Sequence, residues 1–222
     1  MIKKSLKISL LLFVLPLFFN LIVGASNDDF FIDNETIKKV EQKYGAFAKN
    51  RVNALVKLMN SLKNATEKEK LIKVNHFFNQ VRYQSDMITW GEKDYWATRM
   101  EFLGKDRGDC EDYAIAKYFT LEQLGISTDK LYLSYVKATK QKIAHMVLTY
   151  FETKTSVPLV LDNYDKRILP ATQRPDLIPV YSFNGNSLYL AKQQGLGKEV
   201  PSGLSKNKKW TQLLSDIRRN KL

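Results

Sequence analysis

The sequence predicts an α+β protein, in which a group of helices comes first and an antiparallel sheet follows. Over residues 35–81 and 114–124, apolar side chains recur at spacings of three and four, which is typical of amphipathic helices. After Gly125 the pattern changes to short stretches rich in strand-forming residues, which polar connections join. Consecutive strands with short connections pair antiparallel, and helices followed by such strands define the α+β class.

Two helices are expected in the N-terminal part of the chain. The first covers about residues 35–62, and Gly45 is expected to weaken or kink it. The second follows a capping box in which Thr66 is the N-cap and Glu69 is the third helical residue. Its apolar face comprises Leu71, Val74, Phe77, Phe78 and Val81. Two consecutive helices of this kind are ordinary material for a hydrophobic core.

The next helix is expected to begin near the only cysteine, Cys110. Residues 82–105 show no clear period, so a loop region with a short helix near residues 97–103 is predicted there. Gly108 and Asp109 then interrupt the chain, and apolar residues recur at helical spacing as far as Gly125, which is a natural stop. Cys110 is therefore expected at or just before the first turn of a helix that packs into the core.

Three strands are expected after this helix, over about residues 130–138, 143–151 and 157–162. The C-terminal tail predicts a short amphipathic helix with basic flanks, whose apolar residues are Trp210, Leu213, Leu214 and Ile217. The sequence contains no internal repeat and no low-complexity segment. Together these elements place a cysteine-bearing helix against an antiparallel sheet.

The chain begins with the pattern of a secretory signal. Three lysines, at positions 3, 4 and 7, precede an apolar run over residues 8–23, and small residues occupy the −3 and −1 positions before a cleavage point after Ala25. The alternative is an uncleaved membrane anchor, although the run is short for a span of about 20 residues and is interrupted by Pro16 and Asn20. We therefore expect residues 1–25 to be a signal peptide and residues 26–222 to form a single domain in the periplasm.

The charge of the chain indicates a basic surface but not a nucleic-acid partner. The formal net charge is +12, and the positive residues recur along the sequence instead of forming one block. A basic protein can bind nucleic acid or anionic lipid, but the sequence has no base-stacking motif or dinucleotide fingerprint, and export argues against nucleic acid. A solvated basic surface is the simpler interpretation.

Cys110 has an unusual chemical environment. As the only cysteine in the chain it cannot form an internal disulfide, so in an oxidising compartment it pairs between chains or is a reactive thiol. A buried, inert cysteine is the usual alternative. However, Asp106, Asp109, Glu111 and Asp112 lie close to it in the sequence, and four carboxylates do not belong in an apolar core. The pattern therefore favours a reactive thiol.

The order of residues also predicts a nucleophilic site. His145 lies in the second predicted strand and Asp162 ends the third, so a helix presenting Cys110 against this sheet would bring a thiol, an imidazole and a carboxylate together. A cysteine protease needs these three groups as nucleophile, proton acceptor and orienting partner. A helix N-terminus favours the thiolate, and its amides can help to form an oxyanion hole. His76, which is expected to be structural or on the surface, and Asp165 are the competing candidates.

Four stretches carry a resemblance to a known family: RGDCEDYAIAKYFTLEQLGI, DYWATRMEFLG, AHMVL and LVLDN. Together they resemble the bacterial transglutaminase-like cysteine proteases of the LapG type, from about residue 39 to about residue 189. The resemblance implies a papain-like, transglutaminase-like α+β fold, with the nucleophile helix packed on an antiparallel sheet. It also implies a catalytic triad of Cys110, His145 and Asp162. Arg99 departs from the pattern, because proline is expected after the threonine.

The resemblance implies a requirement for Ca²⁺, with acidic ligands on either side of the nucleophile. These match Asp109 and Glu111, and Asp112 is a further candidate metal ligand. Unbalanced carboxylates would raise the pKa of the Cys110 thiol, whereas a bound Ca²⁺ takes several oxygen ligands and adds two positive charges. The stretch is not an EF-hand, because the alternating acids and terminal glutamate of that loop are absent. The alternative is that Asp109 or Glu111 caps the helix.

The resemblance further implies a periplasmic endopeptidase that cleaves the N-terminal region of a large surface adhesin, typically beside a pair of alanines, and so disperses biofilm cells. An inner-membrane cyclic di-GMP receptor of the LapD type is expected to sequester it. Two alternatives remain open: a transglutaminase or amidase that uses the same triad, and a non-catalytic module that binds an adhesin or a receptor. Trp90 and Trp96 are candidate anchors for a partner, or core residues.

Overall fold

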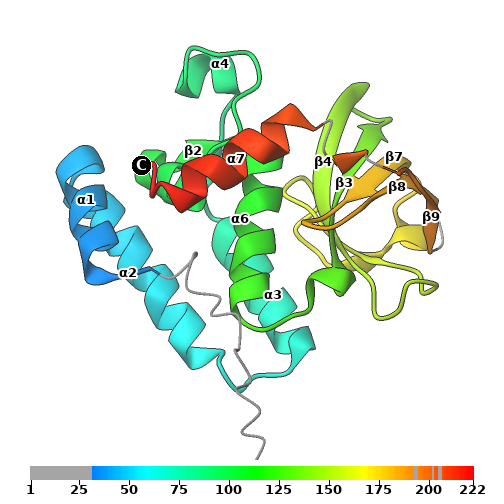
Figure 1. Ribbon diagram of the computed structural model, residues 1–222, viewed down its shortest axis with the longest axis horizontal. Helices are drawn as coiled ribbons and strands as arrows, with labels where there is room; N and C mark the ends of the chain where they lie inside the picture. The colour runs from blue at the N-terminus through cyan, green and yellow to red at the C-terminus, as the bar shows by residue number, and fades with distance from the viewer. Residues whose placement is uncertain (1–31, 193–194, 202, 205–206) are drawn as a thin grey trace, which may run out of the picture.

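The computed structural model describes residues 32–192, 195–201, 203–204 and 207–222. The signal peptide expected over residues 1–25, and its alternative as a membrane anchor, lie outside these ranges. Within them, none of the helices combines the length and the apolar character that crossing a bilayer requires. The molecule has a helical half and a sheet half, and α6 (Cys110–Gln123) lies between the two (Figure 1).

The N-terminal helices form as the sequence predicts, except that the first is divided. Gly45, with φ +86°, ends α1 (Asn34–Tyr44) and precedes α2 (Ala46–Ser61), because this left-handed conformation is one that glycine adopts readily. Helix α3 (Glu67–Phe78) begins after Thr66, whose hydroxyl accepts the backbone N–H of Glu69 at 3.2 Å. The N-cap function predicted for Thr66 is therefore confirmed.

The region between α3 and α6 contains more structure than the sequence indicates. It forms β1 (Arg82–Tyr83), α4 (Asp86–Thr89), α5 (Arg99–Lys105) and β2 (Arg107–Gly108), and α4 protrudes from the rest of the molecule in Figure 1. Helix α5 is the short helix predicted near residues 97–103.

Arg99 occupies the first position of α5, directly after the N-cap Thr98. Proline is common at this position because the first N–H of a helix has no partner within it. Instead, the buried guanidinium of Arg99 donates to Thr120 and Gln123 of α6, both at 3.0 Å. The departure from the family pattern thus adds contacts between the two helices and leaves the start of α5 intact.

The sheet has seven antiparallel strands in the order β6-β5-β4-β3-β7-β8-β9. The three predicted strands are its centre and one side: β3 (Leu131–Ala138), β4 (Ile143–Tyr150) and β5 (Leu159–Leu161). The four strands that the sequence analysis did not predict are β6 (Leu169–Pro170), β7 (Leu177–Phe183), β8 (Leu188–Ala191) and β9 (Leu196–Glu199). Two 3₁₀ turns, η2 (Thr128–Lys130) and η3 (Ala171–Gln173), precede β3 and β7.

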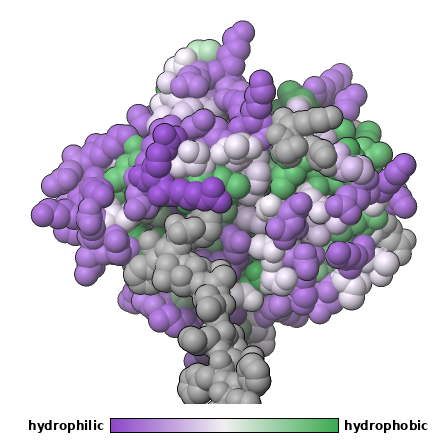
Figure 2. Space-filling view, viewed as in Figure 1, coloured by the Kyte–Doolittle hydropathy of each residue, from purple (hydrophilic) through white to green (hydrophobic). Residues whose placement is uncertain are grey.

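Helix α7 (Lys208–Arg218), predicted from the apolar residues of the tail, crosses α6 in Figure 1, with one end toward the sheet. Its Trp210 is only 2% exposed, and its ring lies parallel to that of Phe119 with centroids 5.6 Å apart. The same indole meets Tyr118 of α6 and Phe183 of β7 edge-on. The tail therefore joins the helical half to the sheet half. Hydrophilic side chains cover much of the face drawn in Figure 2.

Candidate active site

Cys110 is the first residue of α6, with Asp109 as the N-cap. Asp112 holds this turn in place, because its two carboxylate oxygens accept the backbone N–H groups of Asp109 at 3.2 Å and Ala97 at 2.9 Å. Gly108 has no space for a side chain, since a Cβ atom would collide with the carboxylate of Asp112 and the ring of Phe102. Gly108 and Asp112 thus allow the chain to pack closely at the start of α6.

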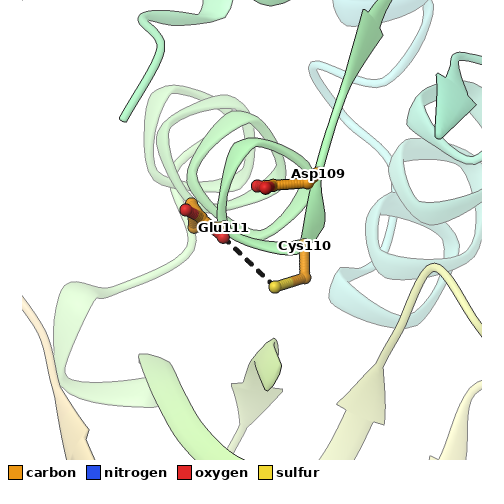
Figure 3. Close-up of side chains that lie close together, drawn as sticks. All are labelled: Asp109, Cys110 and Glu111. Atoms are coloured by element: carbon orange, nitrogen blue, oxygen red, sulfur yellow. Dashed lines mark hydrogen bonds between the residues drawn. The ribbon is translucent and has the colours of Figure 1, made fainter. Parts of the chain in front are cut away.

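The thiol of Cys110 points toward Glu111 (Figure 3), and its Sγ lies 3.1 Å from Oε2 of that residue. Burial, followed by the charges of Glu111 and Asp109, raises the pKa of the Cys110 thiol well above its usual value, and a hydrogen bond from the backbone of Met146 opposes the rise. The two neighbouring carboxylates therefore oppose the loss of the thiol proton. The structure therefore agrees with the expectation from the sequence that unbalanced carboxylates raise the pKa of this thiol.

The acidic cluster around the thiol has a different membership from the one that the sequence suggests. Asp106 is not part of it, because this residue caps α5 and lies 3.6 Å from Arg82 and 3.9 Å from Arg51. Instead, Asp86 of α4 and Asp94 bring carboxylate oxygens within 4.8 Å of Glu111. Sequence reasoning missed both, because they precede Cys110 in a stretch without a periodic pattern.

This cluster has the properties of a cation site. Burial is the main reason that the pKa rises to about 8 for Asp109, about 7 for Glu111 and about 6 for Asp86. One buried oxygen of Asp109 and one of Asp86 have no hydrogen-bond partner among the described residues. Several converging carboxylates with unpaired oxygens fit Ca²⁺, which takes six to eight oxygen ligands. Asp112 also lies within reach, but its oxygens are already engaged by backbone N–H groups.

His145 and Asp162 form a buried pair. Nε2 of His145 lies 2.8 Å from Oδ1 of Asp162, and both residues are 1% exposed. Burial opposes ionisation of Asp162, but the hydrogen bond and charge of His145, with support from Tyr164 and Arg174, hold the pKa of this carboxyl well below its usual range. The ring of Tyr164 lies flat on the imidazole, with centroids 4.2 Å apart and an interplanar angle of 2°. The imidazole is therefore fixed from one edge and one face.

A single cavity of about 730 Å³ connects the cysteine and the histidine. Cys110 and His145 both line it, because α6, which begins at Cys110, packs against β4, which carries His145. Nδ1 of His145 has no hydrogen-bond partner among the described residues, so it is the ring nitrogen that remains free. The rest of the lining includes aromatic and basic side chains, among them Trp96, Tyr135, Tyr181, Lys93, Lys208 and Lys209.

The competing candidates from the sequence lie elsewhere. His76 is exposed on α3, and Asp165 pairs with Arg167 at 2.7 Å. Trp90 and Trp96 are each half-buried and pack against the core, Trp96 with its ring over Phe183. The structure thus places Cys110 and His145 on one cavity, and it joins His145 to Asp162, which does not line that cavity.

Two buried basic residues that sequence reasoning missed also contact Asp162. Arg174 donates to its carboxylate at 2.7 Å, and Lys117 of α6 lies 3.3 Å from its backbone carbonyl, which also accepts from Asn79 at 2.8 Å. A lysine among the apolar residues of a helix resembles a solvated position in sequence, and Arg174 lies in an irregular connection. Neither residue has a local pattern that marks it.

The buried lysine predicts a specific dependence of stability on pH. Burial lowers the pKa of Lys117 to about 7. Between about pH 7 and pH 10.5 the unfolded chain therefore binds a proton that the folded chain does not, so this residue makes the free energy of unfolding increase with pH. We expect Lys117→Met to reduce that slope in denaturant titrations at several pH values, and Lys68→Met, on the exposed face of α3, to leave it unchanged. Equal slopes for wild type and Lys117→Met would contradict the prediction.

The fold and the site define a class of protein. A helix with a cysteine at its N-terminus, packed on an antiparallel sheet that carries a buried His–Asp pair, is the arrangement of papain-like and transglutaminase-like cysteine proteases.

The comparisons with known proteins identify the family. The family model of the bacterial transglutaminase-like cysteine proteinases, BTLCP, matches residues 48–176, and the chain belongs to this family. Among solved structures, the chain is similar to Legionella pneumophila LapG, with 41% identity over 84% of this chain and 98% of that one, and a TM-score of 0.72. The EGTA-treated and calcium-bound forms of LapG match at 42% identity, also with TM-scores of 0.72, and cover 84% of this chain and 98% and 99% of theirs. A search of curated proteins found no match. The predicted fold and the predicted resemblance are confirmed.

Proposed function

We propose that this cysteine protease is a calcium-dependent endopeptidase with the catalytic triad Cys110, His145 and Asp162. The observation that carries the proposal is the cavity lined by both the free cysteine at the start of α6 and the histidine that Asp162 holds. With its proton held on Nε2 by Asp162, the imidazole presents the unpaired Nδ1 as the proton acceptor for the thiol.

In the proposed reaction, Nδ1 of His145 takes the proton of the Cys110 thiol, and the thiolate attacks the scissile carbonyl carbon. The tetrahedral intermediate collapses, the C–N bond breaks, and the imidazolium gives its proton to the leaving amine. This leaves a thioester on Cys110. Water, deprotonated by His145, then attacks the thioester and releases the acid and the thiol. The N–H of Cys110 at the helix N-terminus is the proposed oxyanion donor.

The metal site of this proposal comprises Asp109 and Glu111, which flank the nucleophile, together with Asp86 and Asp94. Asp112 is kept as a further ligand candidate, although its main function is to hold the turn. Calcium bound there would supply the two positive charges that balance the buried carboxylates. Glu111 is the residue that links this site to the nucleophile, because its carboxylate also contacts the thiol. A Glu111 carboxylate engaged by a cation is a poorer acceptor for the thiol proton, which is then free for His145.

The proposed substrate is the N-terminal region of a large surface adhesin, cleaved in the periplasm to release biofilm cells. Two observations support this: the secretory signal pattern over residues 1–25, and the similarity to LapG over 84% of the chain. Residues 26–222 would then be the mature domain. The cavity is also suited to an extended peptide, because its aromatic and lysine side chains offer both apolar contact and hydrogen-bond donors.

The reaction type is tested by the mass of the products. We would incubate residues 26–222 with calcium, the N-terminal fragment of a large adhesin from the same genome, and a primary-amine probe. An endopeptidase gives two fragments whose masses sum to the substrate plus one water, with the cut beside paired alanines. An adduct carrying the amine would instead identify a transglutaminase, and an intact fragment beside a folded protein would favour the binding-module alternative.

Control by cyclic di-GMP is proposed to act through an inner-membrane receptor of the LapD type. We expect the full-length receptor in detergent to retain the protease on size-exclusion chromatography when cyclic di-GMP is present, and to release it without the nucleotide. Adhesin cleavage should slow when the receptor and the nucleotide are added together. Cleavage at an unchanged rate with no co-elution would remove this partner from the proposal and leave the protease activity in place.

A further inference from the structure

The carboxylate of Asp162 has a second ionic partner besides the histidine. Nη2 of Arg174 donates to Oδ2 of Asp162 at 2.7 Å, while Oδ1 accepts from His145 at 2.8 Å and from the backbone N–H of Tyr164 at 3.0 Å. The side chain of Arg174 is 4% exposed and that of Asp162 is fully buried. Each oxygen of this carboxylate therefore has its own set of donors.

Arg174 is itself held in place by Asp176. The guanidinium meets this second carboxylate side-on, with Nε 3.0 Å from Oδ1 and Nη2 2.9 Å from Oδ2. Paired contacts of this kind fix the plane of the guanidinium as well as its distance. Four side chains thus form a continuous chain of hydrogen bonds, from Asp176 through Arg174 and Asp162 to His145.

The backbone around Arg174 is also constrained. Its N–H donates to the carbonyl of Ala171, and its own carbonyl accepts from Leu177, the first residue of β7. The carbonyl of Asp176 accepts the N–H of Thr139, which follows β3. The backbone of Arg174 is therefore bonded to η3 on one side and to the sheet on the other, so the guanidinium reaches Asp162 from a fixed base.

The guanidinium of Arg174 compensates the buried negative charge of Asp162 in the proposed triad. A buried carboxylate is costly unless a positive group compensates it. If the histidine were the only partner, that compensation would require the imidazole to be protonated on both nitrogens, and it could not then accept the thiol proton. Arg174 compensates Asp162 permanently, because a guanidinium does not lose its proton in proteins. With this permanent partner the carboxylate does not depend on a doubly protonated imidazole for its compensation, and Oδ1 remains the acceptor for a proton on Nε2.

We propose that Arg174, fixed by Asp176, is a positioning residue that keeps Asp162 ionised and oriented, so that His145 carries its proton on Nε2 and presents Nδ1 to Cys110. The inference rests on the proposed triad. It assigns no contact with the substrate to Arg174, which does not line the cavity of Cys110. Loss of the guanidinium should therefore lower kcat and leave KM unchanged. Outer residues that orient a functional group typically change activity by about 10- to 100-fold.

The test compares Arg174→Met with Arg174→Lys and Asp176→Asn by two readouts, the kinetic constants and the tautomer of His145. The chain has only two histidines, so ¹⁵N imidazole spectra contain two sets of signals, and His76→Gln assigns them. In wild type at slightly alkaline pH we expect the proton of His145 on Nε2. Arg174→Met should give a mixture of tautomers and a kcat lower by about 10- to 100-fold, and Arg174→Lys should restore most of both.

Wild-type kcat together with a wild-type tautomer in Arg174→Met would overturn the inference. If that variant fails to fold, Asp176→Asn provides the same test. Asp176 is half-buried, and its replacement weakens the contact that fixes Arg174 while keeping the guanidinium. A wild-type kcat and tautomer in Asp176→Asn would also overturn the inference. Asp162→Asn is measured in parallel. If Asp162→Asn stays active, the proposed triad is wrong; if Asp162→Asn is inactive and Arg174→Met is normal, only the function of Arg174 is wrong.

Discussion

Replacing Cys110 by alanine is expected to abolish cleavage and to leave the fold unchanged. The thiol would supply both the attacking atom and the bond to the acyl intermediate, so its loss removes the reaction path, and the rate should fall by at least about 10⁴-fold. Folding should not suffer, because Cys110 is not one of the buried core residues but a partly buried side chain that packs against them, and alanine keeps its Cβ atom. Initial cleavage rates and thermal unfolding by circular dichroism measure the two effects separately.

The two histidines provide a matched control for the same prediction. His145→Gln should lose activity to a similar extent, because no other described residue offers an imidazole to the cavity. His76→Gln, on the exposed face of α3, should keep wild-type activity. Cleavage at the same bond by Cys110→Ala, or equal loss in the two histidine variants, would contradict the assignment of the triad.

Removal of calcium is expected to inactivate the protease and to lower its thermal stability. A ligand that binds only the folded state stabilises it by about 2.7 kcal/mol when its concentration is 100 times the Kd. For a domain of this size that corresponds to roughly 5–10 °C in the unfolding midpoint. We expect EGTA to lower the midpoint by this amount relative to saturating calcium, because the buried carboxylates of Asp109 and Glu111 then lose their balancing charge.

Two glutamate substitutions, Glu111→Gln and Glu92→Gln, distinguish calcium binding at this site from general effects of calcium on the protein. Glu111→Gln should weaken calcium binding in isothermal titration calorimetry and reduce the thermal shift, whereas Glu92→Gln, an exposed acid in the neighbouring loop, should change neither. Asp86→Asn should also weaken binding, because it removes a charged oxygen from the cluster. Wild-type affinity in Glu111→Gln would contradict the metal site while leaving the protease assignment intact.

The parts of the fold that the sequence predicts well are those with strong local signals. Helices α3 and α6 begin after a capping residue and carry apolar faces, and β3 to β5 are short runs of strand formers with polar connections. Strand β7 lacks such a signal because Pro179 interrupts it; the structure accommodates the proline where the pairing with β3 shifts register, at Val136. The position of this register shift depends on how the two strands pair in the folded protein, and no local pattern in the sequence indicates it.

The residues of the candidate site also fall into those that the sequence predicts and those that only the fold shows. Cys110, Asp109 and Glu111 form one local motif, and His145 and Asp162 follow from the order of helix and strands. Asp86, Asp94 and Arg174 reach the site from irregular segments, and only the three-dimensional arrangement brings them there. Asp106 shows the opposite error, because its closeness in sequence does not place it near the thiol. Local patterns and the order of elements therefore predict the candidate triad, whereas the residues that contact it from irregular segments depend on long-range contacts.

The central claim is that one cleavage reaction needs both the Cys110 thiol and a calcium-filled acidic cluster. The most direct measurement incubates residues 26–222 with the N-terminal adhesin fragment in three reactions: with calcium, with EGTA, and with calcium and Cys110→Ala. The products are identified by mass spectrometry. We predict a single cut in the first reaction and none in the other two. A cut that persists in EGTA would contradict the explanation of the acidic cluster, and one that persists without the thiol would contradict the protease mechanism itself.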